Sequence, residues 1–268
     1  MKKRIFITTI IIVCTVVLTS LSIDAADTLR GRSGTLLSNL ISAEKGGCPS
    51  GMVHMAGTSF SCVDAYENSA DPSCPEQAPT TLLQSKTDVD APACASVSVQ
   101  GVIPWTYVTR EQARALCARR GARLPSNDEW YEVALGMQDV DGACNTDGQK
   151  AAQTGSFPAC VTKVKVFDLI GNVWEWTTDD AISGMYNGRP LPESGYVSQV
   201  DKGGVAVASK DTPDDAFYHD YVWTNKTGAY GILRGGFYGS HSDAGIYALH
   251  AETLPTSPGA GIGFRCVQ

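Results

Sequence analysis

The residues whose types could do chemistry gather near the end of the chain, in "LRGGFYGSHSDAGIYALHAETLPTSPGAGIGFRC", residues 233–266. Ser240, His241 and Asp243 supply a hydroxyl, an imidazole and a carboxylate, the groups that a serine hydrolase combines. Ser240 does not lie in a G-x-S-x-G turn, however, so the sequence argues against that chemistry. The same side chains, set in a Gly-flanked loop, would also suit recognition by adaptable hydrogen bonds.

A second candidate site lies in "VFDLIGNVWEWTTD", residues 166–179. Two carboxylates and two main-chain carbonyls offer the hard oxygen ligands that calcium prefers. These four candidate metal ligands are Asp168, Gly171, Val173 and Glu175. The alternative is structural: alternation along a strand places both tryptophans of "WEW" on one side as core anchors and leaves Glu175 in solvent.

Two helices are predicted upstream of these segments. Thr109 with Gln112, and Ser126 with Glu129, form capping boxes, in which each end of the pair hydrogen-bonds the backbone of the other. Gly121 supplies the left-handed stop after the first helix. From residue 140 onward, abundant Gly between short apolar runs predicts loops and short antiparallel strands, so the fold class is α+β.

The N-terminus predicts export. Residues 1–25 carry three basic residues, then an apolar stretch that ends before Ala25, as in a secretory signal peptide. An uncleaved membrane anchor is the alternative. We expect residues 26–46 to be a flexible leader and residues 47–268 to be one domain, secreted, at the cell surface or in the periplasm. Membrane contact is then expected only through the signal segment before cleavage.

Charge and cysteine content narrow the function further. The formal net charge of −7 provides no electrostatic footprint for nucleic acid, so no nucleic-acid partner is expected. Of nine cysteines, Cys14 lies in the signal segment, and the even number that remains indicates disulfides in an exported chain. No CxxC pair or Cys/His cluster has the spacing of a zinc site.

Several fragments together resemble one family. "ARALCARRGARLPSNDEWYEVALG", "VFDLIGNVWEWTTD", "LRGGFYGS" and "GIGFRC" follow one another in an order similar to that of the formylglycine-generating enzyme family, also called the sulfatase-modifying factor domain. The resemblance implies an irregular single domain of C-type lectin-like fold. It also implies a structural calcium at the four ligands named above and a disulfide between Cys117 and Cys266. The other six cysteines pair most simply in sequence order: 48 with 62, 74 with 94, and 144 with 160.

The catalytic residues of that family are not matched. Its oxidases use two cysteines after "RGGS" that bind copper(I), for which thiolates are the suitable soft ligands. At the corresponding positions this chain has Ser240 and Gly245, so no copper is expected. Relatives that use iron need a set of histidines, and the histidines of this chain are scattered. An enzyme of the oxidase type, acting on protein cysteine, remains the alternative function.

The end of the chain is similar to a different group of the same fold, the exported variable proteins that retroelements diversify and that bind ligands. Adenine-directed diversification cannot produce Lys, Met, Gln, Trp or Glu from Asn codons, and Glu252 is the only one of these between 237 and 262. Strand alternation places Tyr247 and Leu249 on one face, toward the core. Ile246, Ala248, His250 and Glu252 lie on the other face, from which His250 and Glu252 look outward. We therefore predict a protein or carbohydrate ligand, bound by Phe237, Tyr238, Ser240, His241, Asp243, His250, Glu252 and Thr253.

Overall fold

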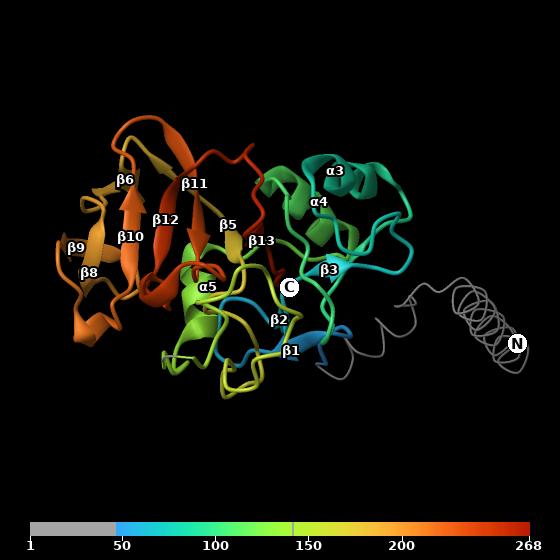
Figure 1. Cartoon of the computed structure of the whole chain (residues 1–268), viewed down its shortest axis with the longest axis horizontal. Coiled ribbons are helices and arrows are strands. Elements are labelled where there is room, and N and C mark those ends of the chain that lie inside the picture. Colours follow the sequence, from blue (N-terminus) through green and yellow to red (C-terminus); the bar gives the residue numbers. More distant parts are fainter. Residues whose placement is uncertain (1–46, 141) are drawn as a thin grey trace, which may run out of the picture. The chain divides into compact units, whose positions relative to one another are not determined.

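The computed structural model describes residues 47–140 and 142–268 (Figure 1). Residues Gly51–Gln268 form one compact unit. The predicted signal peptide and leader, residues 1–46, lie outside the described residues. Within the part that is described, no helix has the length and apolar character needed to cross a membrane.

A nine-stranded sheet dominates the described residues, in the order β7-β6-β5-β11-β12-β10-β8-β9, with β13 beside β5 (Figure 1). Its strands are β5 (Trp174–Ile182), β6 (Met185–Tyr186), β7 (Arg189–Pro190), β8 (Gly195–Val200), β9 (Ala206–Lys210), β10 (Tyr221–Thr224), β11 (Ala229–Arg234), β12 (Leu249–Thr253) and β13 (Ile262–Gly263). Most neighbours are antiparallel, as predicted, but β10 with β12 and β13 with β5 are parallel. The parallel pairs place segments that are distant in sequence side by side in the sheet.

Two small sheets lie in the N-terminal half of the unit. They pair β1 (Met52–His54) with β2 (Cys62–Asp64), and β3 (Ser69–Ala70) with β4 (Ser96–Val97). The end of the chain returns to β2, because Val63 bridges Val267 and the Asp64 N–H donates to the Cys266 carbonyl at 2.9 Å. The C-terminal segment is thus anchored to the start of the domain.

Both predicted helices are present, with the predicted starts. Helix α4 (Arg110–Arg119) begins after Thr109 and helix α5 (Asn127–Ala134) begins after Ser126, each with a complete capping box. Gly121 has a φ of 70°, the left-handed conformation that ends α4. The apolar side of α5, with Trp130, Val133 and Ala134 buried, packs in the core.

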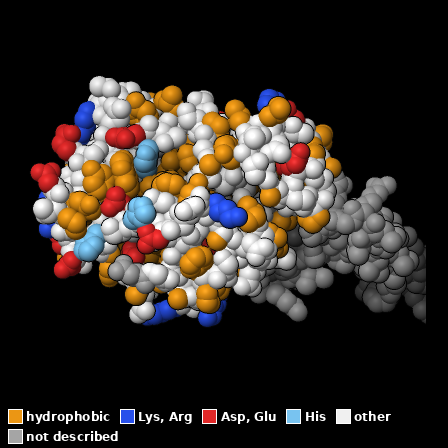
Figure 2. Space-filling model, viewed as in Figure 1, with side chains coloured by type: hydrophobic (Ala, Val, Ile, Leu, Met, Phe, Trp, Pro, Cys, Tyr) orange, Lys and Arg blue, Asp and Glu red, His pale blue; other side chains and the backbone are white. Residues whose placement is uncertain are grey.

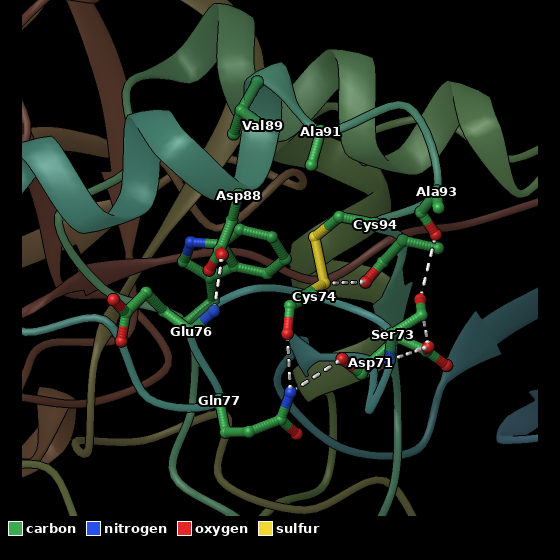
Figure 3. Close-up of a disulfide and its surroundings, with 12 residues drawn as sticks. Asp71, Ser73, Cys74, Glu76, Gln77, Asp88, Val89, Ala91, Ala93 and Cys94 are labelled. Carbon is green, nitrogen blue, oxygen red and sulfur yellow. Dashed lines mark hydrogen bonds between the residues drawn. A yellow bond between two sulfur atoms is a disulfide. The ribbon is translucent and has the colours of Figure 1, made fainter.

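A third helix, α3 (Leu82–Asp90), was not predicted from the sequence, which indicated two helices. Helix α3 has few apolar residues, and its contacts are polar. Asp88 accepts the Glu76 N–H at 2.8 Å, and Ser85 accepts the Trp105 indole N–H at 2.7 Å. Figure 3 shows Asp88 and the Cys74–Cys94 disulfide on the same side of this helix. Local hydrogen bonds and the Cys74–Cys94 disulfide hold α3 in place, so the helix lacks the apolar periodicity by which a helix is recognised in a sequence.

The disulfides follow the predicted pattern where individual pairs are defined. Cys117 is bonded to Cys266, as the family resemblance implied, and the pairs Cys74–Cys94 and Cys144–Cys160 match the sequence-order prediction. Cys48 and Cys62 are also disulfide-bonded. Such a density of disulfides is typical of proteins that fold in an oxidising, extracytoplasmic compartment.

Candidate functional site: an aromatic pocket on a buried polar frame

A buried ion pair holds the C-terminal segment against the centre of the sheet. The Arg265 guanidinium donates to both carboxylate oxygens of Glu175, with N to O distances of 2.5–2.8 Å, and each side chain is 1% exposed. The indole N–H of Trp130 donates to the same carboxylate at 2.7 Å. The sequence-based alternative that left Glu175 in solvent is therefore wrong, because its partner lies 90 residues away.

The four predicted calcium ligands do not form an oxygen cage as they are placed. Glu175 is neutralised by Arg265, and one oxygen of Asp168 accepts the Gly155 N–H at 2.6 Å. Over residues 47–140 and 142–268, no group of three or more His, Cys, Asp or Glu side chains is positioned to hold a metal ion. The residues present thus do not fit calcium, since a cation would have to displace a buried guanidinium.

Two further carboxylates are buried beside this ion pair. Burial raises the pKa of Asp168 to about 6, and it raises the pKa of Glu67 well above its usual range. Glu67 accepts the Val173 N–H at 3.1 Å and an amide hydrogen of Asn172. The Arg265 guanidinium thus lies near three carboxylates, those of Glu67, Asp168 and Glu175. Protonation of a carboxylate relieves part of the repulsion among the three.

Two glycines turn the chain from β11 into the loop that carries the candidate ligand-binding residues. Gly235 and Gly236 have φ values of 90° and 91°, which favour glycine. A side chain at Gly235 would meet the Leu169 carbonyl oxygen at 2.4 Å, and one at Gly236 would meet the Cβ of Ala244 at 2.4 Å. Arg234 precedes them, fully buried, with its guanidinium 5.0 Å from the Trp130 ring. The backbone at Gly235 and Gly236 therefore has no space for a larger side chain.

Beyond this turn, a pocket of about 260 Å³ opens at the surface. Its lining combines aromatic rings from the sheet with polar side chains from the loop after β11. We call it the aromatic pocket, and its lining residues are Trp174, Trp223, Phe237, Gly239, Ser240, His241, Asp243 and His250. Five of the eight predicted ligand-binding residues therefore lie together.

The sheet register explains why the rings meet. Trp223 of β10 lies directly opposite His250 of β12 in the parallel pair. Their ring centroids are 5.7 Å apart, and Trp174 lies 5.5 Å from Trp223 and 5.6 Å from His250. The aromatic row continues away from the pocket through Tyr221 and then Tyr196, at 4.6 and 5.2 Å. Figure 2 shows hydrophobic, acidic and histidine side chains gathered over β8, β10 and β12.

The polar groups of the pocket differ in how much they are already engaged. Ser240 accepts the Phe237 N–H at 3.0 Å, and His241 pairs with Asp147. Burial lowers the pKa of His250 to about 4, so its ring is neutral at pH 7. Burial raises the pKa of Asp243, an effect that nearby His241 opposes. Asp243 is the one carboxylate among the described lining residues.

Three predicted ligand-binding residues do not line the pocket. Tyr238 stacks edge to face on Phe237 at 4.9 Å, Glu252 is exposed on β12, and Thr253 lies at the end of that strand. Ser240 is buried, and Ala248 is fully buried. Sequence analysis missed Trp174 as a pocket residue because it was assigned to the core, and it missed Trp223 because nothing local indicated its parallel pairing.

The positions of the family's two cysteines are occupied differently here. The hydroxyl of Ser240 holds the turn through its bond to the Phe237 N–H. At Gly245, a side-chain carbon would meet Asp220 Oδ1 at 1.9 Å and Asp139 Oδ2 at 2.4 Å. The second position therefore has no room for a cysteine without rearrangement of two buried or partly buried acids.

Comparison with known proteins agrees with the family resemblance. The profile of the sulfatase-modifying factor enzyme 1-like domain matches residues 76–268, and the chain belongs to this family. It is similar to inactive C-alpha-formylglycine-generating enzyme 2 of Bos taurus, with 30% identity over 142 residues that are 42% of this chain and 46% of the relative. It is also similar to hercynine oxygenase of Mycobacterium tuberculosis, with 29% identity over 149 residues, 50% of this chain and 29% of that protein. The chain spans less than half the length of these two relatives.

Among solved structures, two variable proteins show similarity. The Major Tropism Determinant P3c variant aligns with a TM-score of 0.46 and 19% identity, over 82% of this chain and 52% of the other. Treponema denticola variable protein 1 aligns with a TM-score of 0.39 and 13% identity, over 81% and 90% of the two chains.

Proposed function

We propose that the protein is an exported ligand-binding protein that uses the aromatic pocket for recognition. The observation that carries this proposal is the convergence of three aromatic rings and one half-buried carboxylate on a single pocket above a crosslinked frame. Ligand sites are commonly concave, mostly apolar and equipped with a few convergent polar groups. The volume of about 260 Å³ suits a small group presented by a protein or carbohydrate partner rather than a whole polymer.

Two features support recognition over catalysis. Trp174, Trp223 and His250 come from strands of the sheet, and Phe237 follows closely after the buried Arg234 at the end of β11. The oxidase alternative would need two thiols, where Ser240 is engaged in the turn and Gly245 has no space. We expect the protein not to oxidise a Cys-containing sulfatase peptide, with or without copper, and robust formylglycine formation would overturn the proposal.

We further propose that the segment from Phe237 to Ile262 is the part that varies. Asp243 and His241 are accessible positions on a fixed turn, so their replacement changes the pocket rather than the frame. Sequencing of the gene and its surroundings tests this directly. Diversification predicts a reverse transcriptase and a near-copy of the 3′ end nearby, with differences concentrated at pocket codons. Differences spread evenly over frame and pocket would contradict it.

The binding function is tested with a panel of candidate protein and carbohydrate ligands, whose binding is measured for the wild type and for two matched variants. Trp223→Ala removes one pocket wall from a half-buried position, and Tyr230→Ala removes a half-buried ring from β11 that does not line the pocket. Binding of any panel member, measured by calorimetry, should be lost in Trp223→Ala and retained in Tyr230→Ala. Equal binding by both variants would place recognition elsewhere on the domain.

A further inference from the structure

Acidic side chains outnumber basic ones at the aromatic pocket, where the one exposed histidine of the lining, His241, is paired with Asp147. Among the described residues that line it there is no Lys or Arg, and Asp243 contributes a carboxylate. Burial raises the pKa of Tyr221, and Asp243, Glu252 and Asp211 add to this effect, so these acids lie near the same row of rings. His250 is neutral at pH 7. The pocket therefore favours a cation and disfavours an anionic group.

The aromatic walls of the pocket also favour a cation. The face of an aromatic ring carries a negative quadrupole, so a cation placed over Trp, Tyr or Phe is attracted to it. Trp174 and Trp223 stand at 90° to each other, and Phe237 closes another side of the same pocket. Rings in more than one orientation around a small volume can contact a compact cation on several sides.

Hydrogen-bonding capacity separates two kinds of ligand. A sugar presents several hydroxyls that need partners when they are buried. Ser240 accepts one bond from within the protein, and His241 and His250 each use only Nδ1, so the lining keeps few free polar atoms besides the Asp243 carboxylate, the Ser240 hydroxyl hydrogen and the two Nε2 atoms. A fully methylated ammonium has no N–H to satisfy, and its methyl groups suit indole surfaces. A methylated cation therefore leaves none of its own polar groups unsatisfied in this pocket, and the Asp243 carboxylate supplies the opposite charge.

From these observations we propose that the aromatic pocket binds a quaternary ammonium group of the choline type, with Trp174, Trp223 and Phe237 as its walls and Asp243 as its counter-charge. This inference rests on the proposed binding function and specifies its ligand class. The same group occurs free and, with an attached phosphate, as phosphocholine. Asp243 predicts weaker binding of phosphocholine than of free choline, because the phosphate brings negative charge to an acidic rim.

The test is a calorimetric and Trp-fluorescence titration of the full-length, oxidised protein with choline, tetramethylammonium, phosphocholine and 3,3-dimethylbutan-1-ol. The last compound has the shape of choline without its charge. Choline should bind at least about tenfold more tightly than this neutral analogue. Asp243→Asn should weaken choline binding about tenfold and leave the neutral analogue unchanged, while Glu111→Gln on α4, away from the pocket, should change neither.

The possible outcomes separate this inference from the proposed function. Equal affinity for choline and the neutral analogue, or an unchanged affinity in Asp243→Asn, would overturn the cation inference. Tighter binding of phosphocholine than of choline would show that the phosphate is recognised and would also overturn it. If a neutral saccharide from the panel binds and Trp223→Ala abolishes that binding, the inference fails and the binding function stands. Far-ultraviolet circular dichroism of each variant excludes unfolding as the cause of lost binding.

Discussion

The indole rings of Trp174 and Trp223 meet edge to face, with centroids 5.5 Å apart and planes at 90°. They belong to β5 and β10, which are not neighbours in the sheet. His250 of β12 packs against both rings. The pocket walls therefore exist only when the whole sheet has assembled, and the stability of the frame is a condition for recognition.

The long-range disulfide should stabilise the frame more than the local one. Cys117 and Cys266 are 149 residues apart, whereas Cys74 and Cys94 are 20 apart. The chain-entropy account gives about 3 kcal/mol for a short loop of 15 residues and about 4.7 for one of 100. We expect Cys117→Ser with Cys266→Ser to lower the free energy of unfolding in urea by more than Cys74→Ser with Cys94→Ser. A larger loss from the local pair would show that strain or packing, and not loop length, decides the effect.

The buried ion pair should behave as a unit. Glu175→Gln leaves Arg265 buried without the carboxylate that it contacts directly, and Arg265→Met leaves Glu175 buried without a guanidinium, so each should cost roughly 3–5 kcal/mol. The double variant should lose less than the sum of the two, as a double-mutant cycle of urea unfolding measures. The exposed pair Lys86–Asp90 is the control, because Asp90→Asn should cost no more than about 0.5 kcal/mol. Strict additivity of the buried pair would contradict its role. A calcium-dependent rise in the unfolding midpoint would contradict the conclusion that these residues do not fit calcium.

The pH dependence of stability should reveal the buried carboxylate Asp168. Burial raises its pKa from 3.8 to about 6, so the stability linked to its protonation is fully present below about pH 4 and lost as pH rises through 6. Asp168→Asn carries no charge and tolerates the φ of 58°. The variant should match the wild type near pH 4 and exceed it above pH 6 by up to roughly 3 kcal/mol. Urea unfolding at a series of pH values measures this, with exposed Asp211→Asn as control. If the free energies of unfolding of Asp168→Asn and the wild type differed by the same amount at every pH, the protonation of Asp168 would not be the cause.

Much of the frame could be predicted from local sequence, and most of the pocket could not. A capping box is formed by two residues only three positions apart, so it can be recognised in the sequence. Thr109 and Ser126 therefore predicted correctly where α4 and α5 begin. Alternation placed Leu249 inward and His250 on the opposite face. The burial of Glu175 depends on Arg265, and the place of the buried Trp174 in the pocket wall depends on β10. Neither dependence has a local signal, because both arise from pairings between distant segments.

Space at Gly245 gives a further prediction. Gly245→Ala places a methyl group against Asp220 and Asp139, so it should destabilise the protein by more than 1 kcal/mol, the usual scale of overpacking. Gly57→Ala is the matched control, because its φ of 81° is unfavourable but no atom lies within 4 Å of the added carbon. Thermal unfolding of both variants compares the cost of overpacking at Gly245 with the cost of an unfavourable φ at Gly57. A smaller effect at Gly245 than at Gly57 would show that the position can accept a side chain and would revive the oxidase alternative.

The central claim, that the aromatic pocket is the recognition site, is tested most directly by NMR of the five indole N–H groups in ¹⁵N-Trp-labelled protein during titration with choline and the ligand panel. Trp105, Trp130 and Trp176 donate to Ser85, Glu175 and the Val108 carbonyl in the core and serve as internal controls. The account predicts saturable shifts of the Trp174 and Trp223 signals, with the other three unchanged. Binding that leaves Trp174 and Trp223 unshifted would contradict it.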